Sequence, residues 1–363
     1  MALERSYLRK LALTLFDKEA TYNAGPGGWT GTSACLMQDH NEESGVEMWD
    51  DTIQSDTDVV TGHEFRSVQE IVRQGMRLTY TEPRCKPNTL AGLMGLCMGT
   101  VSATQDGVLT AYRHRISPAT SVSLPSIGAQ TLREGGVQRK YHGIKGEQFT
   151  LSHNGAYWQF TCQMIGSGHR APAADAFPST ISENWQRWGN SSIYIKDTSG
   201  TPIDTTFSSP PSQSAANLGG SETNLSTRVI DFTWTWNNNL QADQGYRAST
   251  GVQRQNFHPL RRTSNITIRF EVDSSEEAAD LNYYLNQSKL AIELNVSSGT
   301  AIAGGGVFNS GFIVILPRVQ LTSIPRSQTA ELENLDFIGE VLDDGTNPAA
   351  LAFVYMAKAA YLA

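Results

Sequence analysis

The sequence repeats one order of elements, a strand followed by a short helix and further strands, once in each half of the chain. In the second half, residues 264–273 alternate apolar and polar side chains, which predicts a strand with one buried face. A helix is predicted from Ser274 to about Gln287, with Ser274 as its N-cap and Glu277 as the capping-box partner. Its apolar stripe is predicted to be Ala278, Leu281 and Leu285.

The first half shows the same order. Met76, Leu78 and Tyr80 alternate along a predicted strand, and a helix then begins at Asn88 or Thr89. The stripe expected on this helix is Leu90, Leu93, Met94 and Cys97. Because neither copy carries a catalytic signature, the repeat favours a building block over an enzyme.

Further segments alternate clearly. Asn154-Gly155 predicts a hairpin between strands at 148–151 and 157–165. The returning strand should bury Trp158, Phe160, Cys162 and Met164. Residues 227–236 predict a strand with Ile230, Phe232, Trp234 and Trp236 on one face. More strands are expected at 290–294, 311–317, 331–343 and 350–361.

These patterns predict a mainly β chain with two tandem modules, each with a flanking helix. Residues 1–20 fit a strand through Leu11, Leu13 and Leu15 slightly better than a helix striped by Leu8, Leu11 and Leu15. Little internal structure is expected in 21–60, which suggests an arm that binds a neighbour. The predicted divisions are an N-terminal strand and arm (1–60), a first module (61–195), a Ser/Gly/Pro-rich linker (196–226) and a second module (227–363).

Composition restricts the partners. Charged residues make up 18% of the chain, below the usual ~25%, and a surface of neutral polar residues suits protein interfaces. A net charge of −8 argues against adhesive binding to nucleic acid. The basic clusters at Arg139-Lys140, Lys145 and Arg261-Arg262 are short, so we expect solvated turns or salt bridges between subunits there.

No catalytic, cofactor-binding or metal-binding residue is predicted. Phosphate-binding, dinucleotide-binding, hydrolase, zinc-protease and EF-hand motifs are all missing. His63-Glu64 is a pair expected by chance, and Asp343-Asp344-Gly345 is typical of a hairpin turn. Four cysteines without a CxxC pair are predicted to be free thiols, which suits a reducing cytoplasm: Cys35, Cys85, Cys97 and Cys162.

No targeting segment or membrane partner is expected, since the longest charge-free stretch, 294–317, is rich in Gly, Ser, Asn and Thr. Most tryptophans fall on apolar strand faces. Trp185 and Trp188 lie in a polar stretch, where they either contact a neighbouring subunit or cover their own domain.

Several segments resemble the tail tube proteins of long-tailed bacteriophages. Thr61-Gly62-His63-Glu64 before a strand, then the helix at 90–98, resembles the N-terminal part of that family. Lys140–Gly146 leading into Phe149-Thr150-Leu151 is similar to its turn and hairpin. Residues 232–240, 315–319 and 335–339 resemble its later strands. The likeness covers most of 60–165 and 226–355.

The resemblance implies β-sandwich or barrel modules whose sheets join those of neighbours in a ring. Rings would stack into a hollow tail tube in the virion, through which DNA passes without specific binding. Other tail proteins (tape measure, terminator, baseplate or tip) would be partners, and the chain would be made in the host cytoplasm. With two copies of the fold per chain, three chains would complete a pseudo-hexameric ring. A related terminator or cap ring protein stays possible.

The alternative is a β-rich binding or decoration module, such as a lectin-like protein displayed on a phage particle. In that case Trp185 and Trp188 would be the candidate glycan contacts.

Overall fold

The computed structural model describes residues 10–15, 17–24, 35–39, 45–49, 51–56, 68–105, 111–120, 123–132, 138–172, 183–199, 201–207, 209–241, 245–246, 251–302, 308–329, 332–343, 345, 347–357 and 362. Within these residues the chain is mainly β, with two α-helices. The predicted fold class is confirmed to that extent.

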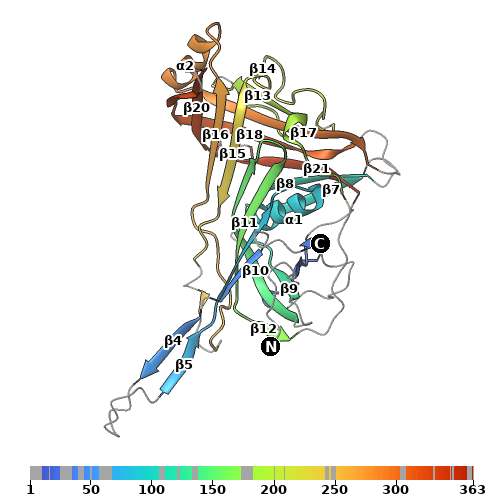
Figure 1. The fold of residues 1–363 in the computed structure, drawn as a ribbon, viewed down its shortest axis with the longest axis vertical. Coiled ribbons are helices and arrows are strands. Elements are labelled where there is room, and N and C mark those ends of the chain that lie inside the picture. Colours follow the sequence, from blue (N-terminus) through green and yellow to red (C-terminus); the bar gives the residue numbers. More distant parts are fainter. Residues whose placement is uncertain are drawn as a thin grey trace.

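Most strands join one strongly curved, barrel-like antiparallel sheet (Figure 1). Its strands pair in this order: β3 (Gly45–Trp49), β6 (Met76–Glu82), β11 (Trp158–Gly166), β10 (Gln138–His153), β15 (Val229–Asn237), β16 (Thr263–Glu271), β20 (Leu332–Val341), β18 (Asn309–Ser323), β21 (Leu351–Met356), β8 (Tyr112–Pro118) and β7 (Gly99–Gln105).

Other strands branch from this path. β18 also pairs with β17 (Lys289–Ala301), which continues to β13 (Ser191–Asp197) and the short β14 (Thr223–Asn224). β19 (Arg326–Thr329) pairs with β20. The long β10 also carries β9 (Ile127–Leu132) and β12 (Arg170–Pro172), and β9 continues to β1 (Lys10–Leu13) and β2 (Cys35–Asp39). A separate hairpin joins β4 (Thr52–Asp56) to β5 (Val68–Arg73).

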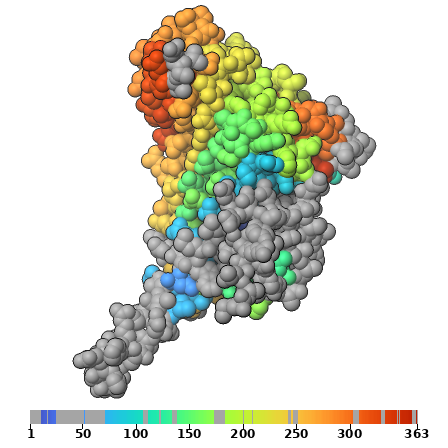
Figure 2. Space-filling model, viewed as in Figure 1, coloured from blue at the N-terminus to red at the C-terminus, as the bar shows by residue number. Residues whose placement is uncertain are grey.

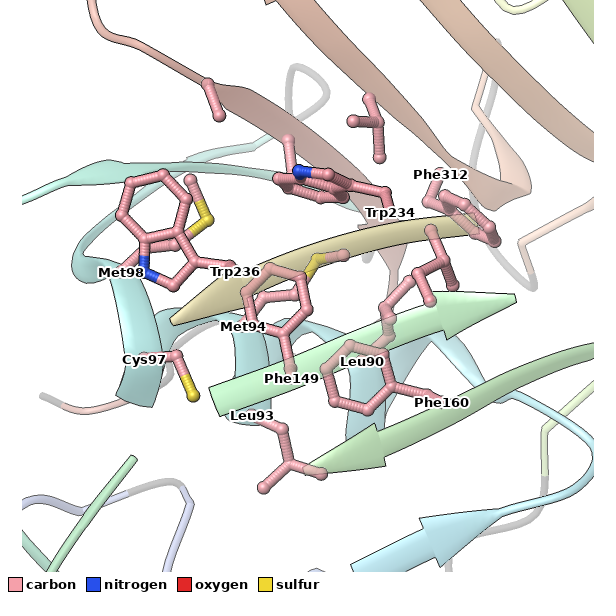
Figure 3. Packing of buried hydrophobic residues seen from close by; sticks show 14 of the residues in the cluster. Leu90, Leu93, Met94, Cys97, Met98, Phe149, Phe160, Trp234, Trp236 and Phe312 are labelled. Atoms are coloured by element: carbon pink, nitrogen blue, oxygen red, sulfur yellow. The ribbon is translucent and has the colours of Figure 1, made fainter. Parts of the chain in front are cut away.

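Helix α1 (Pro87–Met98) lies inside the curve of the sheet, between β10 and the β8–β21 pair (Figure 1). Every one of its residues is buried, so the predicted apolar stripe is correct but too narrow. Pro87 starts the helix, where its missing N–H costs nothing, and Gly99 ends it with φ of +100°. Figure 3 shows Leu90, Leu93 and Met94 of α1 packed among aromatic residues of the strands, including Phe149, Phe160 and Trp234.

The second helix, α2 (Glu277–Leu285), lies on the surface at the end of the molecule, at the top of Figure 2. Its predicted start and stripe were wrong. Asp273 accepts hydrogen bonds from the Ser275 backbone and hydroxyl, and the helix begins only at Glu277, without a capping box. Tyr283 and Tyr284 face the core, whereas Ala278 and Leu285 are exposed.

The strand faces follow the predicted alternation, with one exception. Met76, Leu78 and Tyr80 are buried, as are the four predicted residues of β11. In β15, Phe232, Trp234 and Trp236 are buried, but Ile230 is 41% exposed. The β15–β16 register shifts between Val229 and Asp231, and this bulge turns Ile230 to the outside.

The N-terminal region holds more structure than expected. β1 confirms the strand over residues 10–13, and β2, β3 and β4 lie within the segment predicted to be an arm. β3 pairs with β6 over five residues, so this part of 21–60 belongs to the main sheet.

The two halves exchange strand partners. β10 pairs with β15 from Gln148 to Leu151, and β8 pairs with β21 along Tyr112–Ile116. The unit β6-α1-β7-β8 and the unit β16-α2-β17-β18 have the same order of elements, but one hydrophobic core spans both. The division at 61, 196 and 227 stays a prediction.

Candidate functional site

The outer edge of β7 is the first candidate assembly surface. β7 pairs with β8 along Gly99–Gln105, and no second partner strand lies beside it among the described residues. Thr100 and residues 102–105 are exposed. Along Gly99–Thr104 no described strand pairs with the edge that faces away from β8, and such an edge is a ready site for pairing with another chain.

The other end of this part of the sheet is closed differently. β13 pairs with β17 on one side, and on the other it pairs only with two-residue β14. Leu225 N–H donates to the Ile193 carbonyl at 2.9 Å, and Ser226 Oγ accepts from Ile193 N–H at 2.9 Å. The chain therefore covers the β13 edge with its own backbone, in contrast to the β7 edge.

The segment predicted to be a linker packs on the outer face of the sheet. Ile203, Leu218 and the partly buried Phe207 join a second hydrophobic cluster with Ile313 and Phe353 of β18 and β21. Asn217 donates from its backbone N–H and its Nδ2 to the Glu293 carboxylate, both at 2.6 Å. Burial raises the pKa of Glu293 to about 7 despite these hydrogen bonds.

Hairpin β4–β5 is another candidate assembly surface, and Figure 1 shows it extending away from the rest of the molecule. Its two strands pair antiparallel, from Thr52 opposite Arg73 to Asp56 opposite Val68. At its base, Asp51 accepts from Arg170 Nη2 at 2.5 and 2.6 Å and from Gly75 N–H at 3.3 Å. The ion pair fixes the start of the hairpin to Arg170, the first residue of β12.

A buried polar cluster fixes the N-terminal segment to β10. The Glu19 carboxylate accepts from Ser126 Oγ at 2.6 Å and from Gly143 N–H at 2.9 Å. Burial opposes its ionisation, but hydrogen bonds from His142, Ser126 and backbone amides outweigh burial and lower the pKa of Glu19. Lys145 Nζ donates to Asn256 Oδ1 at 2.7 Å, and burial lowers the pKa of Lys145 to about 8. Lys145 is therefore not a solvated turn residue, which was one of the two expectations for this cluster; a salt bridge between subunits was the other.

Trp185 and Trp188 differ in exposure. Trp188, in the 3₁₀ turn η2 (Trp188–Asn190), stacks on His153 with ring centroids 3.7 Å apart and packs against the core. Trp185 is 44% exposed and lies beside Arg84, whose Cζ is 4.5 Å from its ring centroid. Of the two tryptophans left open by the sequence, only Trp185 is available to a partner.

A family model for phage tail tube proteins matches residues 14–350, which is most of the chain and all of the main sheet except β21, the last strand along the chain. The chain belongs to the phage tail tube protein family. A search of curated proteins found no match. The family is structural rather than enzymatic, and it places the chain in the virion tail.

Among the residues that the structure describes, no three His, Cys, Asp or Glu side chains gather where a metal ion would bind. None of the described helices has the length and apolar character to cross a membrane. The described cysteines Cys85, Cys97 and Cys162 are free and buried.

Some predicted positions have no structural account. His63-Glu64, within the resemblance to the family, lies outside the described residues, as do Asp344 and the side chain of Cys35. The sequence missed the free edge of β7, because residues 99–105 are polar and lack strong alternation. A run of Thr, Val and Ser after a helix-ending glycine is the signal that indicates this strand.

Proposed function

We propose that this chain assembles into rings that stack into the hollow tail tube through which phage DNA is delivered. The observation that carries the proposal is the free edge of β7. Pairing in a closed ring would supply the missing hydrogen-bond partners of every chain at once, and ring closure removes a liability for uncontrolled aggregation.

Hairpin β4–β5 supports the stacking of rings. It projects from the body (Figure 1), and its base is anchored by the Asp51–Arg170 ion pair. A projecting hairpin held at its base suits contact with a chain in the next ring. The repeated strand–helix–strand order supports three chains per ring, each supplying two copies of the pattern.

The charge of the chain suits a DNA conduit. A net charge of −8 disfavours phosphate adhesion, so DNA would pass through the lumen without specific binding. We also propose tape measure, terminator and tip proteins as partners, and synthesis in the host cytoplasm, where the three buried thiols would stay reduced.

The edge of β7 can be tested with adjacent proline variants. Neighbouring residues of a strand direct their N–H groups to opposite edges. Of the two variants Ser102→Pro and Ala103→Pro, one therefore removes an N–H that bonds to β8, and the other removes an N–H at the edge that faces away from β8. Both side chains are exposed, which leaves room for the ring. The variant altered at the free edge should stay folded but form few tubes, as measured by circular dichroism and negative-stain microscopy.

Two results would contradict the proposal. Normal tubes from both proline variants would exclude β7 as the ring contact, and six chains per ring by native mass spectrometry would exclude the trimeric ring. Discrete particles at every concentration of the unaltered protein would favour the decoration module instead.

A further inference from the structure

A cleft of about 500 Å³ opens beside Trp185, at the end of the molecule where β11 begins and β17 ends. It is lined by Tyr157, Glu183, Asn184, Trp185, Arg187 and Asn190, and by Ser298 and Thr300 of β17. None of its lining residues belongs to β7 or to hairpin β4–β5. Its volume is within the ~300–1,000 Å³ range of small-molecule sites.

Trp185 is exposed yet fixed in place. Arg84 covers part of the indole and does not line the cleft. The Tyr157 ring meets it edge to face, with centroids 5.8 Å apart. The next residue is anchored on both sides, since Gln186 N–H donates to the Cys85 carbonyl at 2.9 Å and its carbonyl accepts from Trp158 N–H at 3.0 Å. A ring held by its surroundings binds without losing much side-chain entropy.

The segment that carries Trp185 is also tied to the core helix. The Glu183 carboxylate accepts from Asn88 N–H, in the first turn of α1, at 2.8 Å. Burial raises the pKa of Glu183 to about 7. The positions of Trp185 and Asn184 therefore depend on the rigid centre of the fold and do not need a ligand to set them.

The lining indicates the class of ligand. Beside the indole stand two amides, Asn184 and Asn190, and the hydroxyls of Tyr157, Ser298 and Thr300. The cores of protein interfaces are more apolar than this. Single-stranded nucleic acid needs a basic groove, and Arg187 is the one Lys or Arg among the residues that line the cleft.

A sugar ring matches both features of the cleft. Its C–H face packs on an aromatic ring, and its hydroxyls exchange hydrogen bonds with amides and other hydroxyls. We propose that the Trp185 cleft binds a neutral oligosaccharide. This site goes beyond tube assembly, and it would give the outside of a tail a contact with glycans.

The experiment is saturation-transfer NMR on the full chain with three probes: maltotriose, cellotriose and N,N′,N″-triacetylchitotriose. At least one should receive saturation with a Kd near 1 mM or tighter. Trp185→Ala should weaken that binding by roughly tenfold or more. Asn190→Ala should weaken it less, and Trp185→Phe should retain part of it, since the aromatic face remains.

Leu285→Ala is the matched control, because it shortens an exposed apolar side chain on α2, outside the cleft. It should leave binding unchanged, and thermal melts will show that each variant is folded. No saturation transfer to any of the three sugars, or equal transfer with Trp185→Ala, overturns the proposal.

Loss of tubes in Trp185→Ala without sugar binding by the unaltered chain would also overturn it, and would make Trp185 a subunit contact. Sugar binding by a chain that forms no tubes would support the proposed sugar site and contradict the proposed ring assembly. The two proposals therefore fail independently.

Discussion

Helices α1 and α2 occupy equivalent places in the repeated order of elements but opposite environments. α1 has no charged residue, and all of its residues are buried between β10 and β8–β21. α2 carries Glu277 and Asp280 in its first turn and buries only Asp280. A helix that is apolar all round is enclosed, and one with a polar face stays at the surface. The same local pattern thus serves as a core in one half and as a surface in the other.

The same substitution should have very different costs in the two helices. Leu93 is fully buried, so Leu93→Ala should destabilise the protein by about 2–5 kcal/mol. Leu285 is 69% exposed, so Leu285→Ala should change stability by less than about 0.5 kcal/mol. Urea unfolding of both variants measures the difference, and similar midpoints would break the comparison.

The surface helix should depend on ion pairs where the core helix depends on packing. Arg228 Nη2 donates to Asp280 Oδ2 at 2.6 Å, and Arg228 also pairs with Glu276. Burial raises the pKa of Asp280 although Arg228 opposes it. Arg228→Ala should cost about 1.5–3 kcal/mol in urea unfolding, because a charge-assisted bond is lost and Asp280 stays buried. Adding Asp280→Asn should restore part of that loss. Arg228 Cζ also lies 5.0 Å from the centroid of the Phe270 ring, and no recovery would assign the cost to the loss of that contact.

Replacing Gly92 of α1 with alanine should destabilise the protein, although alanine has the higher helix propensity. Gly→Ala in an exposed helix stabilises by about 1 kcal/mol. A Cβ on Gly92, however, would lie 2.6 Å from Leu15 Cδ1. Gly92→Ala should therefore destabilise by about 1–3 kcal/mol in thermal or urea unfolding. Leu15→Val in the same chain removes Cδ1 but keeps Cβ, which would lie 2.8 Å from the added atom, so it should relieve only part of the clash. A stabilised single variant would show that α1 is less tightly enclosed.

Glu82, the last residue of β6 before α1, should make stability depend on pH. Burial raises the pKa of Glu82 to about 8, so the folded state holds this proton more tightly than the unfolded chain does. Its contribution is complete below the unfolded pKa of about 4.5 and is lost as pH rises through about 8. Between about pH 4.5 and 8, Glu82→Gln should lose less stability than the unaltered protein.

Glu183, whose pKa is raised to about 7, should leave some pH dependence in that variant. Equal slopes of unfolding free energy against pH for Glu82→Gln and the unaltered protein would exclude Glu82 as the titrating group.

Much of the local structure was predictable. Asn154-Gly155 forms the expected turn, with Gly155 at φ of +84° and Asn154 Oδ1 accepting from Tyr157 N–H at 2.8 Å. Ile230 is the exception because it lies in a β-bulge. A bulge inserts an unpaired residue into one strand, and the alternation of apolar and polar residues does not show where that happens. Residues 87–98 contain no charged side chain, which indicates a helix buried on all sides; the predicted apolar stripe covered only one side of it.

The candidate surfaces were less predictable. The arm at 21–60 contained strands that pair with β1, β5 and β6, and the segment predicted to be a linker is held to the sheet by Asn217 and Glu293. Trp185 was left open by the sequence, because its exposure depends on residues from β17 and from the turn before α1.

The sequence by itself determined which side chains of each strand face inward, where the main hairpin turns and that the chain is built mainly of strands. These features depend on neighbours within a few residues, through the two-residue period of strands and the chemistry of turns. The tertiary structure alone decided that β10 pairs with β15, that β8 pairs with β21 and that α1 is enclosed. Alternation defines a face but not a partner, and the choice among many apolar faces is made only when distant segments pack together.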